Sequence, residues 1–201
     1  MFGSKEIVIR SGRRLIVRPM VKEDEKALFD FFSRLPDDLL MFIRHNVKDP
    51  NVIKEWVDHL NYDRVLPLVA LDGDRIVADV TLHRIPYGWK RHIGQVRIVV
   101  DPEFHGQGLA TAILNEVVEL GAEFGLEKLW AEVPLDSVAA VKAFKNAGFR
   151  CKAVVEGLVK DLRGNNIDIL IMVCDIEQFY DTKWLKKASQ KVQQPAEGVS
   201  A

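Results

Sequence analysis

The strongest structural constraint in the sequence is a strand–turn–helix–strand unit in the middle of the chain. Residues Ile93–Val100 are rich in β-branched side chains, which favour a strand. Apolar residues then recur at helical spacing from Leu109 to Phe124, and Gly125 follows as a helix-ending glycine. A second strand is predicted at Lys128–Val133. Such a crossover joins strands of one sheet that run roughly parallel.

Elements of antiparallel type surround this unit. The predicted strand pairs are Glu6–Arg10 with Leu15–Arg18, Leu66–Leu71 with Arg75–Ile85, and Arg150–Lys160 with Ile167–Cys174; the other predicted helices are Val21–Ser33, Leu39–Ile43, Val52–Leu60 (with Asn51 as its cap) and Asp136–Ala147. This order predicts an α+β fold with a single mixed, mostly antiparallel sheet flanked by helices. We expect one domain over residues 1–180. Residues 183–201 have too little apolar content to order themselves and are expected to form a disordered tail.

Composition and charge exclude several classes of protein. The chain has 201 residues with 28 Lys and Arg against 29 Asp and Glu, so it lacks the basic excess of a nucleic-acid binder. No apolar run approaches the roughly 18 residues of a membrane helix, and no secretion signal is present, so we expect no membrane partner and a cytoplasmic location. No Cys and His cluster has the spacing of a metal site, which predicts no metal.

The turn between the first strand and the long helix carries the chemical signal. Residues 105–110 read HGQGLA, so two glycines precede the helix. A helix N-terminus offers unpaired N–H groups and a positive dipole end to a phosphate, and glycines allow close approach. A P-loop would need Gly-Lys-Ser/Thr, which is absent, and a dinucleotide fingerprint starting at Gly106 would need Gly or Ala where Thr111 stands.

The same turn resembles a family motif. The segment 96–150 is similar to the acetyl-CoA-binding core of the GNAT superfamily of N-acetyltransferases, whose motif is Arg/Gln-x-x-Gly-x-Gly/Ala. In this chain His105 replaces the first residue. Downstream, Gly148-Phe149 matches a second family element, in which Ser137 stands for Asn and Phe144 for Tyr. Residues 129–133 look most like bacterial protein-lysine acetyltransferase domains.

The resemblance implies the acyl-CoA N-acyltransferase type of fold, with its core at about residues 93–150. It implies acetyl-CoA as co-substrate and direct transfer of the acetyl group to a primary amine, on a protein lysine or a small molecule; a homodimer stays open. A non-catalytic acyl-CoA sensor or interaction module is the alternative. The residues that the resemblance assigns to acetyl-CoA are Ile98, Val99, Val100, His105, Gly106, Gln107, Gly108, Leu109, Ala110, Ser137 and Phe144.

The catalytic residues are less well defined. Gln95 holds the position where relatives often have a catalytic Glu, and Phe144 cannot act as the acid that Tyr provides. Glu132, on the strand beside the expected thioester site, is the candidate base. Asp79 is expected to face outwards, and Glu116, Glu119 and Glu123 to form a solvated helix face. The acceptor side is expected from Leu35–Leu66 and the Lys160–Asn166 hairpin.

Overall fold

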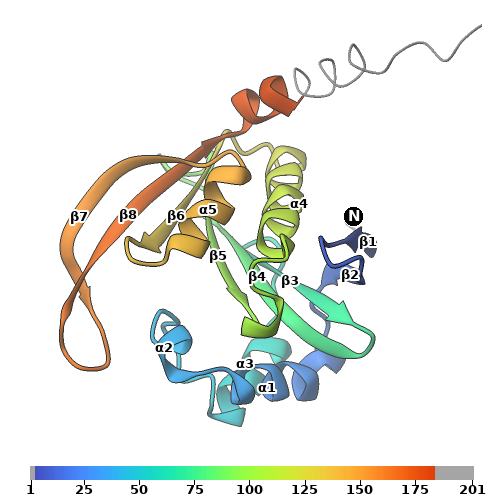
Figure 1. Ribbon diagram of the computed structural model, residues 1–201. Coiled ribbons are helices and arrows are strands. Elements are labelled where there is room, and N and C mark those ends of the chain that lie inside the picture. The colour runs from blue at the N-terminus through green and yellow to red at the C-terminus, as the bar shows by residue number, and fades with distance from the viewer. Residues whose placement is uncertain (1–2, 184–201) are drawn as a thin grey trace, which may run out of the picture.

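One eight-stranded sheet organises the chain (Figure 1). The computed structural model describes residues 3–183, so all of the predicted tail beyond Lys183 lies outside the described residues. In the order β1-β2-β3-β4-β5-β6-β8-β7, only the pair β5–β6 is parallel, which confirms the predicted mixed, mostly antiparallel sheet. The strands are β1 (Lys5–Val8), β2 (Arg14–Pro19), β3 (Val65–Asp72), β4 (Arg75–Arg84), β5 (Ile93–Val100), β6 (Lys128–Pro134), β7 (Arg150–Lys160) and β8 (Asn166–Asp175).

Helices cover both faces of the sheet (Figure 1). The labelled α-helices are α1 (Glu25–Arg34), α2 (Asp37–Leu40), α3 (Pro50–Asp58), α4 (Leu109–Glu123) and α5 (Val138–Asn146), and short 3-10 turns occupy Lys22–Asp24 and Pro102–Phe104. Residues 176–183, after β8, are also helical. Helices α4 and α5 pack on one face, while α1 and α3 pack on the other. Within residues 3–183, no helix is long and apolar enough to span a bilayer.

Strands β3 and β4 lie between the two helical layers and are buried on both faces. Leu68 and Ala70 belong to the larger core cluster, which contains α4, whereas their neighbours Val69 and Leu71 belong to the cluster around α1 and α3. Because side chains in a strand alternate between faces, one strand can supply two cores. This explains why the β3 and β4 sequences read as nearly continuous apolar runs.

Two expected helix boundaries are corrected. The cap of α3 is Asp49 rather than Asn51, because Pro50 lacks an N–H group and fits the first helical position. The side chain of Asp49 accepts a hydrogen bond from the main-chain N–H of Asn51 (2.9 Å). Helix α2 ends at Leu40, and the expected helical residues beyond it form a turn that leads over the pocket described below.

The expectation that Glu116 is solvated is wrong. Glu116 is only 7% exposed, and the Nζ of Lys5 in β1 lies 2.6 Å from Glu116 Oε2. The N-terminal edge strand therefore adds a partner to the α4 surface, and a helical pattern of glutamates could not reveal a lysine more than one hundred residues away. This ion pair links β1 to the helix that begins at the glycine turn.

The parallel pairing of β5 and β6 requires a close approach at Gly94, which pairs with Leu129. A Cβ atom at Gly94 would lie 2.6 Å from Leu82 Cδ1, 2.9 Å from Leu126 Cδ1 and 2.9 Å from Leu129 Cδ2. All three leucines are buried, so their side chains have little room to move.

We expect Gly94→Ala to destabilise the protein by about 1–3 kcal/mol, because even one methyl group overpacks this contact. Urea denaturation measures the change, and Gly3→Ala is the matched control, since a Cβ there meets nothing within 4 Å. Equal stabilities for the two variants would contradict the close approach.

Candidate active site

Strands β5 and β6 separate after a short stretch of pairing. Their register contains only Ile93↔Lys128, Gly94↔Leu129 and Gln95↔Trp130. Beyond these pairs β5 continues to Val100 and β6 to Pro134, while β6 stays paired with β8 on its other side. An opening therefore lies between the ends of two adjacent strands, and the main-chain groups on the β6 side of β5 lack a strand partner there.

The direction of these main-chain groups follows from the register with β4. The N–H of Asp101 donates to the carbonyl oxygen of Val77 (2.9 Å), and the β4–β5 pairing continues from there without a shift. Since alternate residues of a strand point their N–H groups to the same side, the N–H of Val99 also points towards β4. The N–H and C=O groups of Ile98 and Val100 therefore face the opening.

Asp101 fixes the turn that follows β5. Its carboxylate is buried and accepts hydrogen bonds from Arg34 Nε (2.9 Å), Arg75 Nη2 (2.8 Å) and the main-chain N–H of Glu103 (3.0 Å). Burial alone would raise the pKa of Asp101, but these hydrogen bonds outweigh it and lower the pKa. The carboxylate thus joins α1, β4 and the glycine turn through charge-assisted hydrogen bonds.

The glycine turn presents unpaired main-chain donors. Gly106 and Gly108 have positive φ angles of 73° and 86°, a conformation that glycine adopts without strain. Among the described residues, no acceptor is found for the N–H groups of residues 106–110, and the first bond of α4 runs from Ala112 to Gly108 (3.0 Å). Several N–H groups and the positive end of a helix of four turns therefore converge on one place.

Arg10, between β1 and β2, also reaches this turn. Its main-chain N–H donates to the carbonyl oxygen of Gln107 (2.9 Å). Its side chain lies over Gly108, with Nε 3.5 Å from the position that a Cβ there would occupy. Nothing in the sequence indicated this contact, because Arg10 is far from the motif in the chain and carries no signature of its own.

One cavity of about 1050 Å³ connects the opening with the glycine turn. Of the predicted site residues, Gln107 is not part of its wall. The others all line it: Gln95, Ile98, Val99, Val100, His105, Gly106, Gly108, Leu109, Ala110, Glu132, Ser137 and Phe144.

Two aromatic rings in this region have other contacts. The imidazole of His105 folds back so that Nε2 lies 2.9 Å from the carbonyl oxygen of Val100. The ring of Phe144 is largely buried and packs edge-on against Phe149, with 5.0 Å between the ring centroids.

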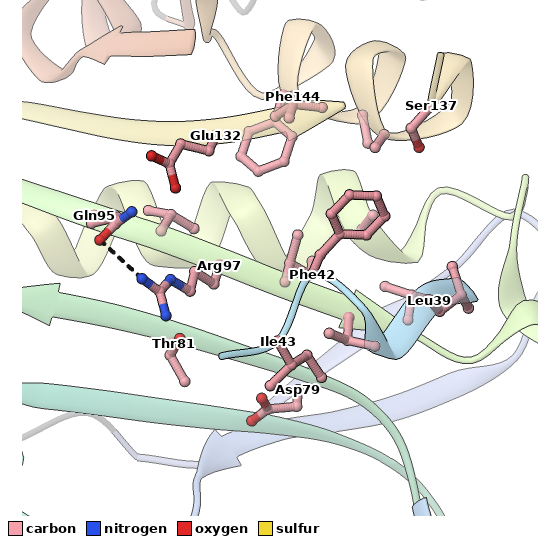
Figure 2. A pocket seen from close by; sticks show the side chains of 18 of the residues that line it. Leu39, Phe42, Ile43, Asp79, Thr81, Gln95, Arg97, Glu132, Ser137 and Phe144 are labelled. Carbon is pink, nitrogen blue, oxygen red and sulfur yellow. Dashed lines mark hydrogen bonds between the residues drawn. The ribbon is translucent and has the colours of Figure 1, made fainter. Parts of the chain in front are cut away.

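A row of polar side chains forms the opposite end of the cavity (Figure 2). We call it the acceptor face: Asp79, Thr81 and His83 of β4 with Gln95 and Arg97 of β5. The register pairs Thr81 with Arg97 and His83 with Gln95, so these side chains share one face of the sheet. Glu132 of β6 points towards Gln95 and Arg97 from across the opening (Figure 2).

The end of α2 and the turn after it lie over the acceptor face, where Leu39, Phe42 and Ile43 line the cavity (Figure 2). Part of the segment 35–66, from which we expect the acceptor side, therefore contributes to the cavity wall. The hairpin contributes differently, since Leu158, Val159 and Lys160 at the end of β7 line the cavity and the turn 161–166 does not.

Asp79 is buried, so the expectation that it faces outwards is wrong. The residue is 8% exposed, because the turn after α2 and the neighbouring strands cover its face of the sheet. Loss of water raises the pKa of Asp79 to about 7.

Burial has the opposite effect on the imidazole of His83. Burial, followed by the positive charges of Arg97 and Arg44, lowers the pKa of His83 to about 4. His83 is therefore neutral at pH 7.

The raised pKa of Asp79 makes stability depend on pH. Between the ordinary pKa of 3.8 and about 7, the folded protein keeps a proton that the unfolded chain releases, so stability falls as pH rises through this window. The free energy of unfolding of the wild type should therefore fall between pH 5 and pH 8, whereas that of Asp79→Asn lacks this contribution. We expect the stability of the variant relative to the wild type to be about 2–3 kcal/mol greater at pH 8 than at pH 5, at about 1.4 kcal/mol per pKa unit.

Urea denaturation at both pH values measures the difference, with Asp30→Asn on the exposed side of α1 as the control. Parallel pH dependence of all three proteins would show that Asp79 titrates in its ordinary range.

Comparison with known proteins identifies the family. The family model described as "Acetyltransferase (GNAT) family" matches residues 27–149, more than half of the chain. An uncharacterized N-acetyltransferase of Methanocaldococcus jannaschii is 34% identical over 74 residues, which is 35% of this chain and 32% of that protein. The [ribosomal protein bS18]-alanine N-acetyltransferase of Escherichia coli K12 is 35% identical over 52 residues, or 26% of this chain and 35% of that protein. The matches thus span about a third of each relative.

Solved structures share the fold at lower identity. The ribosomal-protein-S5-alanine acetyltransferase of Vibrio fischeri superimposes with a TM-score of 0.75 at 17% identity, covering 89% of this chain and 99% of the other. The GNAT domain of PAT from S. lividans gives a TM-score of 0.69 at 22% identity, with coverage of 86% and 96%. With the family model matched across the glycine turn and the separated strands, the chain belongs to the GNAT family of acetyltransferases.

Proposed function

We propose that this protein transfers an acetyl group from acetyl-CoA to a primary amine, on a protein lysine or a small molecule. The observation that carries the proposal is the continuous cavity from the glycine turn, through the opening between β5 and β6, to the acceptor face. A long, bent ligand with phosphates at one end and a reactive thioester at the other suits such a path. The family membership supports the same donor.

The residues present fit acetyl-CoA. The pyrophosphate would meet the free N–H groups of residues 106–110 and the guanidinium of Arg10. The pantetheine arm would run along β5, where the main-chain groups of Ile98 and Val100 face the opening and can pair with its amides. One of these N–H groups, that of Ile98 or that of Val100, could instead stabilise negative charge on the thioester oxygen, whereas the N–H of Val99 points towards β4.

The acceptor must lose a proton before it reacts. A lysine amine has a pKa near 10.4, so it is mostly protonated at neutral pH. A base takes one proton from the ammonium group, and the nitrogen lone pair then forms a bond to the thioester carbonyl carbon. The carbon–sulfur bond breaks, the nitrogen loses its second proton, and the sulfur of CoA leaves as a thiolate that is protonated to the thiol. The products are an N-acetyl amide, CoA and one proton.

Glu132 is our proposed base. Residue Glu132 is exposed and lines the cavity, and its carboxylate points towards Gln95 and Arg97 across the opening (Figure 2). Gln95, at the position where relatives often have a glutamate, can only donate or accept hydrogen bonds. Asp79 is the second candidate, because it reaches the same cavity and its pKa of about 7 suits proton transfer at neutral pH.

A non-catalytic acyl-CoA sensor is the second candidate function. Gln95 and Phe144 favour it, since both positions lack the ionisable group that related enzymes often use. Binding of acetyl-CoA would raise the melting temperature of a sensor protein by mass action. A sensor would not release CoA when amines are added. Release of CoA thiol in the presence of amines, followed by mass spectrometry of the product, therefore tests the proposed activity.

For the base, we expect Glu132→Gln to lower kcat by about a hundredfold or more, the usual contribution of general-base catalysis, with little change in acetyl-CoA affinity. Glu156→Gln on the exposed strand β7, outside the cavity wall, is the matched control and should keep full activity. Wild-type turnover by Glu132→Gln would exclude this role.

If Asp79 is the base instead, Asp79→Asn should be the inactive variant, and the wild-type kcat should rise with pH around the Asp79 pKa of about 7.

For the donor site, we expect Arg10→Gln to weaken CoA binding about three- to tenfold at low salt and less at high salt, because an exposed charge near a phosphate is screened by ions. Calorimetry measures the affinity, and Arg14→Gln on β2 is the control, since its guanidinium pairs with Glu6 (3.1 Å) instead. Equal affinities for the two variants would remove Arg10 from the phosphate site.

A further inference from the structure

Arg97 is a cation in the cavity wall without an acidic partner. Its guanidinium is half-buried, and within residues 3–183 no carboxylate oxygen lies within 4.0 Å of it. Its one side-chain hydrogen bond is to the neutral Gln95 Oε1, at a long 3.4 Å. Arginine stays charged in proteins, and a partly desolvated guanidinium normally pairs with a carboxylate or phosphate. The fork of donors on Arg97 is therefore available to a ligand.

A second cation faces the same place. Arg44, in the turn over the acceptor face, lines the cavity; burial lowers the pKa of Arg97 and of His83, and the positive charge of Arg44 lowers both further. His83 adds no third charge at pH 7, because its pKa is about 4 and its Nε2 lies 3.0 Å from Thr81 Oγ1. Two arginines, one on β5 and one in the turn after α2, thus line the same cavity.

Carboxylates lie beside these cations but leave them unpaired. Glu132 is near enough for its charge to oppose the lowering of the Arg97 pKa, yet the two side chains do not form an ion pair. Asp79 sits on the same face of β4 and is partly protonated at neutral pH. The acceptor end therefore offers a negative group for an amine at β6 and positive groups for an anion at β5 and in the turn after α2.

We propose that the amine acceptor is a small molecule that carries its own carboxylate, an amino acid, and that Arg97 and Arg44 bind this carboxylate while Glu132 faces the amine. This rests on the proposed function. The segment that carries Leu39, Phe42 and Ile43 covers the acceptor face, which favours a small acceptor over a folded protein surface (Figure 2). The two cations also lower the pKa of a nearby ammonium group, because like charges disfavour its protonated form. A polyamine or a lysine in a basic peptide would be repelled.

Matched pairs of acceptors test the proposal. The full chain is supplied with acetyl-CoA and with each proteinogenic L-amino acid or its carboxamide, together with spermidine and a lysine peptide, and CoA release is followed. The amide keeps the amine and the side chain but lacks the anion. For the best amino acid we expect kcat/KM to exceed that of its amide by about ten- to a hundredfold. A hydrogen bond between charged groups contributes a free energy that corresponds to a change of this size.

Variants assign this preference to the guanidinium. Arg97→Gln should remove most of the preference, mainly through a higher KM for the amino acid, with an unchanged KM for acetyl-CoA; Arg97→Lys should restore part of it. Arg44→Gln should reduce it less, since Arg44 is exposed. Arg91→Gln, in the β4–β5 turn outside the cavity wall, is the control and should leave it unchanged.

The outcomes separate the two proposals. Turnover that does not distinguish amino acids from amides, or that prefers spermidine or the lysine peptide, overturns the carboxylate proposal and leaves the acetyltransferase in place. Amino-acid preference that survives Arg97→Gln also overturns it. Absence of CoA release with every acceptor would overturn the proposed function and this inference together.

Discussion

The site depends on the separation of β5 and β6 after Gln95 and Trp130. Parallel strands normally continue to exchange hydrogen bonds, and buried main-chain groups that lose their partners must find others. Beyond this point the facing edges of β5 and β6 lack a strand partner, and on β5 the residues that face the opening are Ile98 and Val100. The fold therefore creates a line of main-chain donors and acceptors inside its own sheet, which a ligand with amides of its own can complete.

The surrounding structure holds this opening at both ends. Gly94 lets the strands approach closely just before they separate, and Asp101 fixes the turn just after β5 through Arg34 and Arg75. The cluster around α4 supports the phosphate end, while the turn after α2 covers the acceptor end. In our proposal the donor and the acceptor therefore bind at opposite ends of one cavity, with Arg10 at the phosphate end and Arg97 and Arg44 at the acceptor end.

The geometry of the candidate donor site, a strand, a glycine turn and a helix, could be predicted from the sequence because it is local. The two glycines, the strand before them and the helix after them are consecutive in the chain. The acceptor face could not be predicted in the same way. Asp79 was expected to face outwards, but the turn after α2, which carries no motif, covers it. Arg10 and Arg44 reach the cavity from distant segments, and the sequence could not show that Arg97 forms no ion pair within residues 3–183.

Hydrogen exchange of the main-chain amides, with and without acetyl-CoA, tests the central claim most directly. The N–H groups of residues 106–110 and those of Ile98 and Val100 lack described partners or face the opening, so they should exchange fast in the free protein. Our account predicts that acetyl-CoA slows exchange in these two segments selectively and that NAD does not. Unchanged exchange there at saturating acetyl-CoA, or protection confined to another part of the chain, would contradict it.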